Sequence, residues 1–281
     1  MKKNEYLENE NVLGFIKWII PRISGDIKFS HQYTNQRSNT EWSCDSIYNA
    51  FENYNWRFSC KIPKQGIITG STFGESEEAL KIIENGMRLS ILNEDAEKLL
   101  IYSKAVLEWG GVLRSNYIKL EEMGKEIIPI FQNAIHKLNP EAVNTDDDFS
   151  DIIMNSGFTK LYSLIIDNFI IYDSRVGAAL GLLIKEYLTE MNIKEIPKVL
   201  NFAFGNARPN NTDSGNLNRR NPGNEIYRFP VLANNPRRHT INNIYANWLV
   251  KELSQKSKFK DENNSIRKLE SALFMIGYSV V

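Results

Sequence analysis

The chain has 281 residues, of which 42% are hydrophobic, so it can bury a sizeable core as one large domain or two closely packed ones. Its 34 basic residues balance its 34 acidic residues. This neutrality excludes a global field that attracts nucleic acid or an anionic membrane, so any charged binding surface must be local.

The N-terminal sequence lacks the features of a targeting segment. Residues 1–6 lead into Glu8 and Glu10 rather than into an apolar stretch, and Lys17 interrupts the first hydrophobic segment. Signal peptides and membrane anchors need an uninterrupted apolar run. We therefore expect a cytoplasmic protein with no membrane partner.

Residue types that bind transition metals are sparse. Cys44 and Cys60 are the only cysteines, and His31, His136 and His239 lie far apart in the sequence. Paired spacings such as Cys-x-x-Cys or His-x-x-x-His are absent from the sequence. This pattern argues against metal catalysis by histidine or cysteine and predicts no cofactor, while a magnesium site made of carboxylates alone stays open.

Apolar residues recur at helical spacing through most of the chain, as at Ala79, Leu80, Ile82 and Ile83. The pattern predicts a mainly α-helical protein. The predicted helices span 5–20 (ended by Pro21), 45–54, 76–91, 94–108, 116–137, 159–167, 174–190, 194–204, 240–255 and 264–276.

Between Trp56 and Thr72, β-branched and turn residues predict a short β-hairpin. The acidic run 146–148 is typical of a solvated linker. We expect three segments: an N-terminal helical lobe with the β element (1–92), a helical core (93–204), and a long loop followed by C-terminal helices that pack back on the core (205–281).

An apolar run ends at Asp173, and Arg175 follows at the start of a predicted helix. Aspartate is a preferred helix N-cap, so this residue is interpreted first as a cap. A carboxylate fixed there beside an arginine is also suited to stabilise developing positive charge. Upstream, Gly157 forms a turn that opens a helix with Lys160 in its first turn, and such a turn offers backbone amides to an anion.

The connection 205–240 is long, rich in Asn, Pro and Gly, and without a clear element of its own; such loops are usually functional or disordered. Six arginines against Asp213 and Glu225 give it a net charge of +4. Guanidinium groups match phosphate oxygens, so the loop predicts a DNA-backbone contact surface. The alternative is an exposed loop whose arginines pair with surface acids. The arginines are Arg208, Arg219, Arg220, Arg228, Arg237 and Arg238.

In this order along the chain stand a glycine turn, a helix with a lysine, an apolar connection and a carboxylate at the next helix start. The same order of features is found in the helix-hairpin-helix DNA glycosylases, which this part of the chain resembles. The block 156–176 is most similar to their bacterial 8-oxoguanine-glycosylase-like branch, with a lysine in Phe158-Thr159-Lys160-Leu161 and then Tyr172-Asp173-Ser174-Arg175-Val176. The usual Gly-x-Gly hairpin is replaced here by Gly157-Phe158-Thr159.

This resemblance implies a two-lobed helical fold with a small β element, acting as a monomer that excises a modified base from DNA. Asp173 would stabilise an oxocarbenium-like sugar or orient the attacking water. Arg175 would hold that carboxylate or a flanking phosphate, and Gly157 and Thr159 would lie at the DNA-binding hairpin. Lys160, if it reaches C1′, would form a Schiff base and cleave the strand; otherwise the product is an abasic site.

A base removed from DNA must first leave the stack, which requires a pocket with aromatic or apolar walls. The candidate walls are Trp42, Trp109 and Tyr172, with Asp45 to read exocyclic donors; core packing and helix capping are the alternatives. By resemblance, the base is a hypermodified phage cytosine such as glucosylated 5-hydroxymethylcytosine, with a role in anti-phage defence or DNA repair. The other functional hypothesis is a non-catalytic helical DNA-binding protein in which Asp173 is only a cap.

Overall fold

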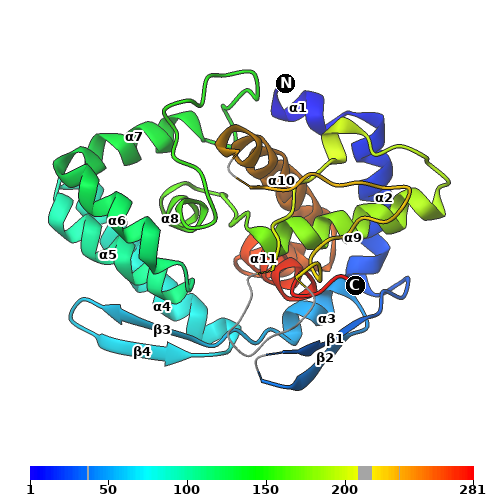
Figure 1. The fold of residues 1–281 in the computed structure, drawn as a ribbon, viewed down its shortest axis with the longest axis horizontal. Helices are drawn as coiled ribbons and strands as arrows, with labels where there is room; N and C mark the ends of the chain where they lie inside the picture. The colour runs from blue at the N-terminus through cyan, green and yellow to red at the C-terminus, as the bar shows by residue number, and fades with distance from the viewer. Residues whose placement is uncertain (37, 208–216, 234) are drawn as a thin grey trace. The chain divides into compact units, whose positions relative to one another are not determined.

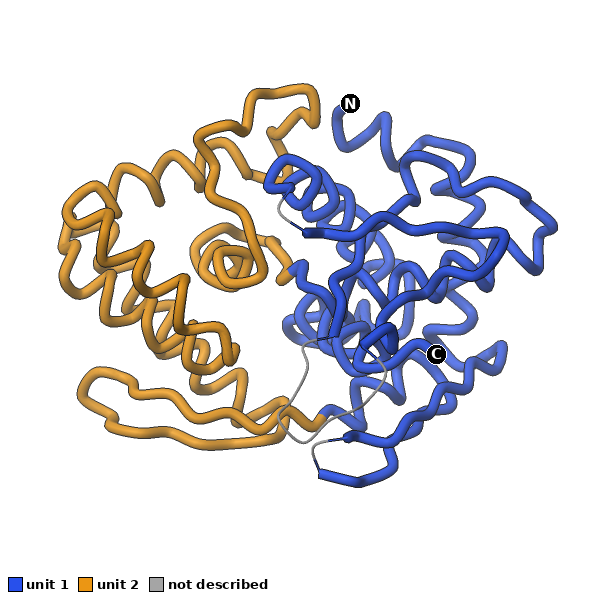
Figure 2. The backbone as a smooth tube through the Cα atoms, viewed as in Figure 1, with its two compact units in different colours: residues 1–54, 172–281 blue, residues 55–171 orange. Residues whose placement is uncertain are grey.

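The computed structural model describes residues 1–36, 38–207, 217–233 and 235–281. This part of the chain is mainly helical with two small antiparallel sheets of two strands, which confirms the predicted fold class (Figure 1). The chain forms two compact units (Figure 2). Unit 1 joins residues 1–54 to 172–281, and unit 2 is the segment 55–171, so the compact units do not follow the three consecutive segments expected from the sequence.

Unit 1 carries the predicted carboxylate motif. In this unit α11 packs against α3, α9 and α10, and α2 packs against α9. Its elements are α1 (Lys3–Leu7), α2 (Glu10–Ser24), β1 (His31–Asn35), β2 (Thr40–Cys44), α3 (Ile47–Glu52), α9 (Ser174–Glu190), η2 (Lys198–Leu200), α10 (Pro236–Lys256), η3 (Lys258–Asp261) and α11 (Ser265–Ile276).

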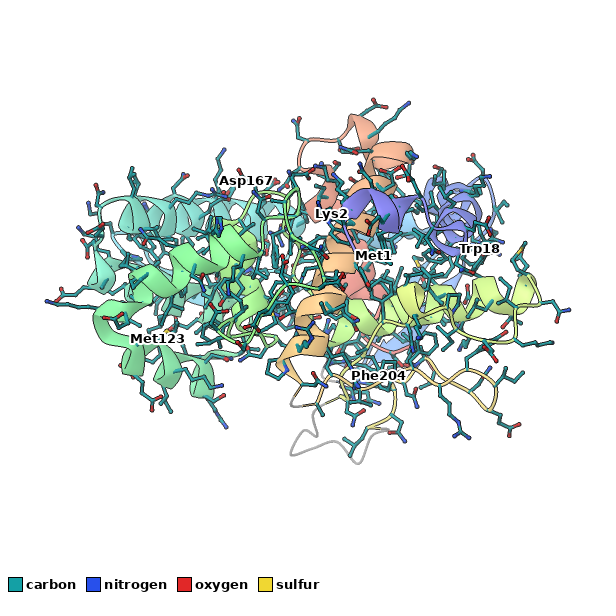
Figure 3. The ribbon with its side chains drawn as sticks, turned by 90° about the horizontal axis from the view of Figure 1, so that it is seen from above. Met1, Lys2, Trp18, Met123, Asp167 and Phe204 are labelled. Atoms are coloured by element: carbon teal, nitrogen blue, oxygen red, sulfur yellow. The ribbon has the colours of Figure 1, made fainter. Side chains whose placement is uncertain are left out.

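The helix α2 continues through Pro21 to Ser24, so the prediction that Pro21 ends it was wrong. Proline removes one amide donor from the helix. Next to it, Arg22 stacks over the ring of Trp18 at 3.8 Å and pairs with Glu190 on α9 at 2.7 Å, contacts that hold this end of α2 in the unit. Trp18 is labelled in Figure 3. Gly25, with a φ of 88°, then ends the helix in the left-handed conformation.

The predicted helix 194–204 does not form; only the short η2 is helical there, and this prediction was wrong. The backbone N–H and C=O groups that would form hydrogen bonds within a helix bond to another segment of the chain instead. Phe204, labelled in Figure 3, donates to Pro230 O at 3.0 Å and accepts from Leu232 N at 2.8 Å. The segment also lies against α9, since a Cβ at Gly177 would collide with the carbonyl oxygen of Ala203.

Unit 2 contains the hairpin predicted between residues 56 and 72, with Phe58 opposite Gly70 and Ile62 opposite Gly66. The predicted helix 116–137 is divided near Gly124, whose φ is 54°. The unit's elements are β3 (Phe58–Ile62), β4 (Gly66–Gly70), α4 (Phe73–Leu92), α5 (Ala96–Trp109), α6 (Leu113–Met123), η1 (Gly124–Glu126), α7 (Ile127–Lys137) and α8 (Phe158–Ile165). Across the described residues of both units, no helix has the length and apolarity that a bilayer span requires.

Candidate active site

Asp173 caps the N-terminus of α9. Its Oδ1 atom accepts hydrogen bonds from the amides of Arg175 at 2.9 Å and Val176 at 3.3 Å. The residue is 7% exposed. Two amide donors fix the carboxylate at the positive end of the helix dipole, where a negative charge is stabilised.

Tyr172 anchors the chain just before this carboxylate. Its hydroxyl donates to Ala203 O at 2.6 Å, and its carbonyl oxygen is 2.7 Å from Nε2 of His239 on α10, which must donate this bond because a carbonyl only accepts. Tyr172 is completely buried. It therefore offers no surface to a substrate in this structure, in contrast to the expectation that it lines a base pocket, and instead fixes the backbone that presents Asp173.

Arg220 brings a positive charge to the start of α9. Its Nη1 atom donates to Ser174 Oγ at 2.5 Å. Burial lowers the pKa of Arg220, the positive charges of Arg175 and Arg219 add to this effect, and the charge of Asp173 opposes it. Arg220 is thus close enough to Asp173, Arg175 and Arg219 to interact electrostatically with each of them.

The other two arginines lie on aromatic rings. The guanidinium carbon of Arg175 is 4.2 Å from the ring centre of Phe274 and 4.9 Å from that of Tyr278. Arg219 is buried, lies 5.1 Å from the same Tyr278 ring centre, and donates to Gln36 Oε1 at 2.9 Å. We call Arg175, Arg219 and Arg220 the arginine cluster; Arg175 and Arg219 lie on the same Tyr278 ring, and Arg220 interacts electrostatically with both of them and with Asp173.

The remaining loop arginines are not in this cluster. Arg228, Arg237 and Arg238 are exposed. Arg238 donates to Val231 O at 3.2 Å. Arg208 lies outside the described residues. The loop arginines predicted as one contact surface thus include two that belong to the arginine cluster, Arg219 and Arg220, and three that are exposed.

Trp42 and Asp45 lie in the N-terminal part of unit 1. Trp42 is half-buried, donates to Asn53 O at 2.8 Å, and stacks on Tyr33 with 4.8 Å between ring centres. Tyr33 in turn stacks on Tyr278 at 4.7 Å. Trp42 is thus the outer ring of an aromatic column that ends at the arginine cluster. Asp45 is exposed, and the cap of α3 is the neighbouring Ser46 rather than Asp45.

The turn before α8 differs from the anion-binding turn expected from the sequence. The amides of Gly157 and Phe158 donate to Asn155 Oδ1 at 2.7 and 3.1 Å. Thr159 is buried, and its hydroxyl donates to Ile170 O at 3.3 Å. These groups are therefore not offered to a DNA phosphate in this structure. A Cβ at Gly157 would collide with the end of the Asn116 side chain, which would have to shift.

Lys160 and Trp109 lie in the interior of unit 2. Lys160 is 4% exposed, its Nζ donates to Ser156 O at 3.1 Å, and its methylenes pack against Gly110. Trp109 is buried and donates through Nε1 to Ser76 Oγ at 2.8 Å. Trp109 thus packs as a core residue of unit 2 rather than as an exposed pocket wall.

The sequence interpretation missed Phe274, Tyr278 and Gln36, which hold the arginine cluster. No local motif marks them, because their role depends on contacts with residues far away in the chain. Among the described residues, no three His, Cys, Asp or Glu side chains are grouped so as to hold a metal ion. Comparisons of the chain with protein-family models, curated proteins and solved structures found no match.

Proposed function

We propose that this protein is a DNA N-glycosylase with Asp173 as its catalytic carboxylate. The observation that supports the proposal is one carboxylate, fixed by two amides, beside the arginine cluster. Cleavage of an N-glycosidic bond develops positive charge on the sugar, while the phosphates on both sides of that sugar are negative. A site for this reaction needs a negative group with positive charge near it, and the start of α9 has the carboxylate of Asp173 with the guanidinium group of Arg220 close by.

In the proposed reaction, water attacks C1′ while the bond from C1′ to the base nitrogen breaks. The bonding electrons leave with the base, and the proton released from water ends on the base or on solvent. Asp173 stabilises the oxocarbenium-like sugar and orients the water. The product is an abasic site. The alternative lyase reaction needs an amine that forms a Schiff base at C1′. The sequence resemblance implies Lys160 for that role, but Lys160 is buried in unit 2 and its Nζ donates to Ser156 O. We therefore favour the hydrolytic reaction.

The substrate is inferred from the sequence resemblance. We propose a modified base, with a hypermodified phage cytosine such as glucosylated 5-hydroxymethylcytosine as the leading candidate, and a role in anti-phage defence or repair. A panel of duplex and single-stranded DNAs that carry different modified bases, including DNA from phages with modified cytosines, tests this. Released bases are measured by mass spectrometry and abasic sites by alkaline strand cleavage.

The matched control is Asp173→Asn, which keeps a good helix N-cap but removes the charge. We expect base release to fall by at least about 100-fold, with only a small decrease in melting temperature from the lost interaction of the charge with the helix dipole. If this variant releases the base as fast as the wild type, Asp173 is not the catalytic group. Borohydride trapping of a covalent DNA complex during base release would identify the lyase reaction instead of hydrolysis.

The second candidate function is a non-catalytic DNA-binding protein. It is favoured by the completed cap, because the same carboxylate has a structural role at α9. DNA binding without base release across the whole panel would support this function and contradict the glycosylase.

A further inference from the structure

We propose that the outer edge of β4 pairs with β4 of a second copy of this chain. The pairing would be antiparallel, about a two-fold axis at Ile68, and would join the hairpins of the two copies into one continuous sheet. The dimer does not depend on the proposed function, and it would replace the monomer that the sequence resemblance implies.

The hydrogen bonds of the hairpin β3–β4 show which backbone groups face outward. Lys61 lies opposite Ile67, and the Lys61 amide donates to the Glu108 carboxylate on α5 at 2.8 Å rather than to β4. In an antiparallel ladder, pairs that exchange hydrogen bonds alternate with pairs that do not, and the latter turn their N–H and C=O groups to the outer edges. Ile67 and Thr69 therefore direct these backbone groups away from β3.

This outer edge is open to another strand. Ile67 is 73% exposed, and Thr69 is also exposed. No hydrogen bond reaches their outward backbone groups from the rest of the described chain. β3 packs against α5, and β4 lies on the far side of β3 (Figure 1). Edge strands are usually protected by a charged side chain, a proline or a bulge, whereas the sequence 66–70 contains neither a charged residue nor a proline.

A second β4 matches this edge because the two-fold axis places outward-facing groups opposite one another. Ile67 of one copy lies opposite Thr69 of the other, so each such pair exchanges both of its N–H···O=C bonds. The side chains of Ile67 and Thr69 share one face of the strand, and the two Ile67 side chains become diagonal neighbours across the axis. The association thus covers an exposed apolar side chain in each copy.

The charges at the two ends of β4 favour the antiparallel arrangement. The turn before the strand carries the exposed Lys64, and the first two turns of α4 carry the exposed Glu75 and Glu78. α4 begins beside the end of the strand, since a Cβ at Gly70 would lie 2.8 Å from Glu75 Cβ. An antiparallel pair brings the lysine turn of each copy to the acidic helix start of the other. A parallel pair would bring like charges together, which disfavours it.

Two substitutions at the edge test the pairing. Thr69→Pro removes an outward N–H group that does not bond to β3, so the hairpin is retained while the edge is blocked. Ile67→Lys places two ammonium groups beside the axis. We measure the dissociation constant of the full chain by sedimentation equilibrium over a wide range of concentrations.

Short paired strands bury little area, so we expect a weak, reversible dimer. Each edge variant should raise the dissociation constant at least about tenfold, because it removes hydrogen bonds or apolar contacts in both copies. Leu89→Lys is the matched control, since Leu89 is another exposed apolar residue of unit 2, 57% exposed and near the other end of α4. It should dimerise as wild type does.

Exchanging the end charges tests the orientation and the identity of the partner. Lys64→Glu and Glu78→Lys should each weaken the dimer, because each variant places like charges at both ends of the paired strands. The double variant should restore it. An equimolar mixture of the two single variants should also restore it, because every end contact is then between opposite charges; this result identifies the partner as a second copy in antiparallel orientation.

The proposal is overturned if the wild-type chain stays monomeric at every concentration, or if folded Thr69→Pro and Ile67→Lys dimerise as tightly as wild type. Circular dichroism melting shows which variants fold, and Ile67→Lys, at an exposed position, remains informative if Thr69→Pro does not. Dissociation of the dimer by Leu89→Lys as well would place the interface on α4 and contradict the strand pairing. Failure of both charge exchanges to restore the dimer would contradict the antiparallel arrangement.

Discussion

Arg220 donates a hydrogen bond to Ser174, with 2.5 Å between Nη1 and Oγ, and Ser174 is the residue that follows Asp173. The bond joins the long connection after residue 205 to the first turn of α9. It places a cation from a region of irregular structure beside a carboxylate that the helix holds rigidly. The loop thereby becomes part of the candidate site at this point.

Replacing Ser174 with alanine tests this link. The substitution removes the acceptor of a largely buried guanidinium group, and we expect the free energy of unfolding to fall by about 1 to 3 kcal/mol. DNA affinity should also fall, because Arg220 is then free to leave the cluster. Urea denaturation and anisotropy measure the two effects. Ser150→Ala, at an exposed serine of unit 2, is the control. If the two variants have equal free energies of unfolding and equal DNA affinities, the bond from Arg220 to Ser174 contributes to neither quantity.

Local sequence patterns predicted the helices and one hairpin well where a single face is apolar. α4, α5 and α9 lie close to their predicted ranges, and β3 and β4 lie within the predicted segment. The hairpin β1–β2 was not predicted, since Tyr33 and Trp42 form a cross-strand pair whose packing depends on Tyr278. The discontinuous unit 1 could not be predicted from composition, because it is created by contacts between the two ends of the chain.

The charged residues of the candidate site could be predicted from the sequence, but the residues that hold them in place could not. Asp173 and Arg175 belong to one local motif, and Arg219 and Arg220 stand out as loop cations. Tyr278 does not, because the position of a ring beneath two arginines is set by tertiary packing. The amides near Gly157 show the opposite case: the sequence indicates an anion-binding turn, but the side chain of Asn155 already accepts from them.

The buried ring of His31 predicts a loss of stability in mild acid. Its Nε2 atom lies 2.8 Å from Ser279 O and 3.2 Å from Ile276 O, and it donates because carbonyl oxygens only accept. Burial lowers the pKa of His31 from its ordinary value of 6.5; the hydrogen bonds to Ser279 and Ile276 oppose this effect in part, and the charge of Lys185 adds to it. The unfolded chain therefore takes up a proton at a higher pH than the folded chain does. Stability is highest above pH 6.5 and decreases as the pH falls toward the lower folded-state pKa.

His31→Gln removes this titration while keeping a side-chain donor. We expect urea denaturation between pH 7.5 and pH 5.5 to show a smaller decrease in the free energy of unfolding for the variant than for wild type. DNA binding of the wild type should weaken over the same range if the C-terminal segment around Ser279 loosens. Parallel pH profiles for the two proteins would exclude His31 as the source.

From the first turn of α4 we predict a second loss of stability, at a more acidic pH. Glu75 accepts hydrogen bonds from the amides of Ser71 and Thr72 and from the Thr72 hydroxyl, and these bonds lower its pKa to about 2. The carboxylate stabilises the fold above its ordinary pKa of 4.5, and this contribution is lost as the pH falls toward 2. Glu75→Gln should therefore flatten the pH dependence of unfolding between these values. A variant as acid-sensitive as wild type in this range would contradict the assignment.

The contact between Gly110 and Lys160 predicts a substitution that moves the candidate lyase lysine without removing it. Alanine at residue 110 would place its Cβ 2.5 Å from Lys160 Cδ, and the side chain must shift within the interior of unit 2. We expect Gly110→Ala to lower the free energy of unfolding by about 1 to 3 kcal/mol. Gly74→Ala is the control, because a Cβ there meets no atom within 4 Å and α4 gains a better helix former. Denaturation of the two variants measures the difference. Where base release is accompanied by borohydride trapping, Gly110→Ala should reduce the trapped fraction and Gly74→Ala should not; trapping that is equal in both variants would show that the nucleophile is not Lys160.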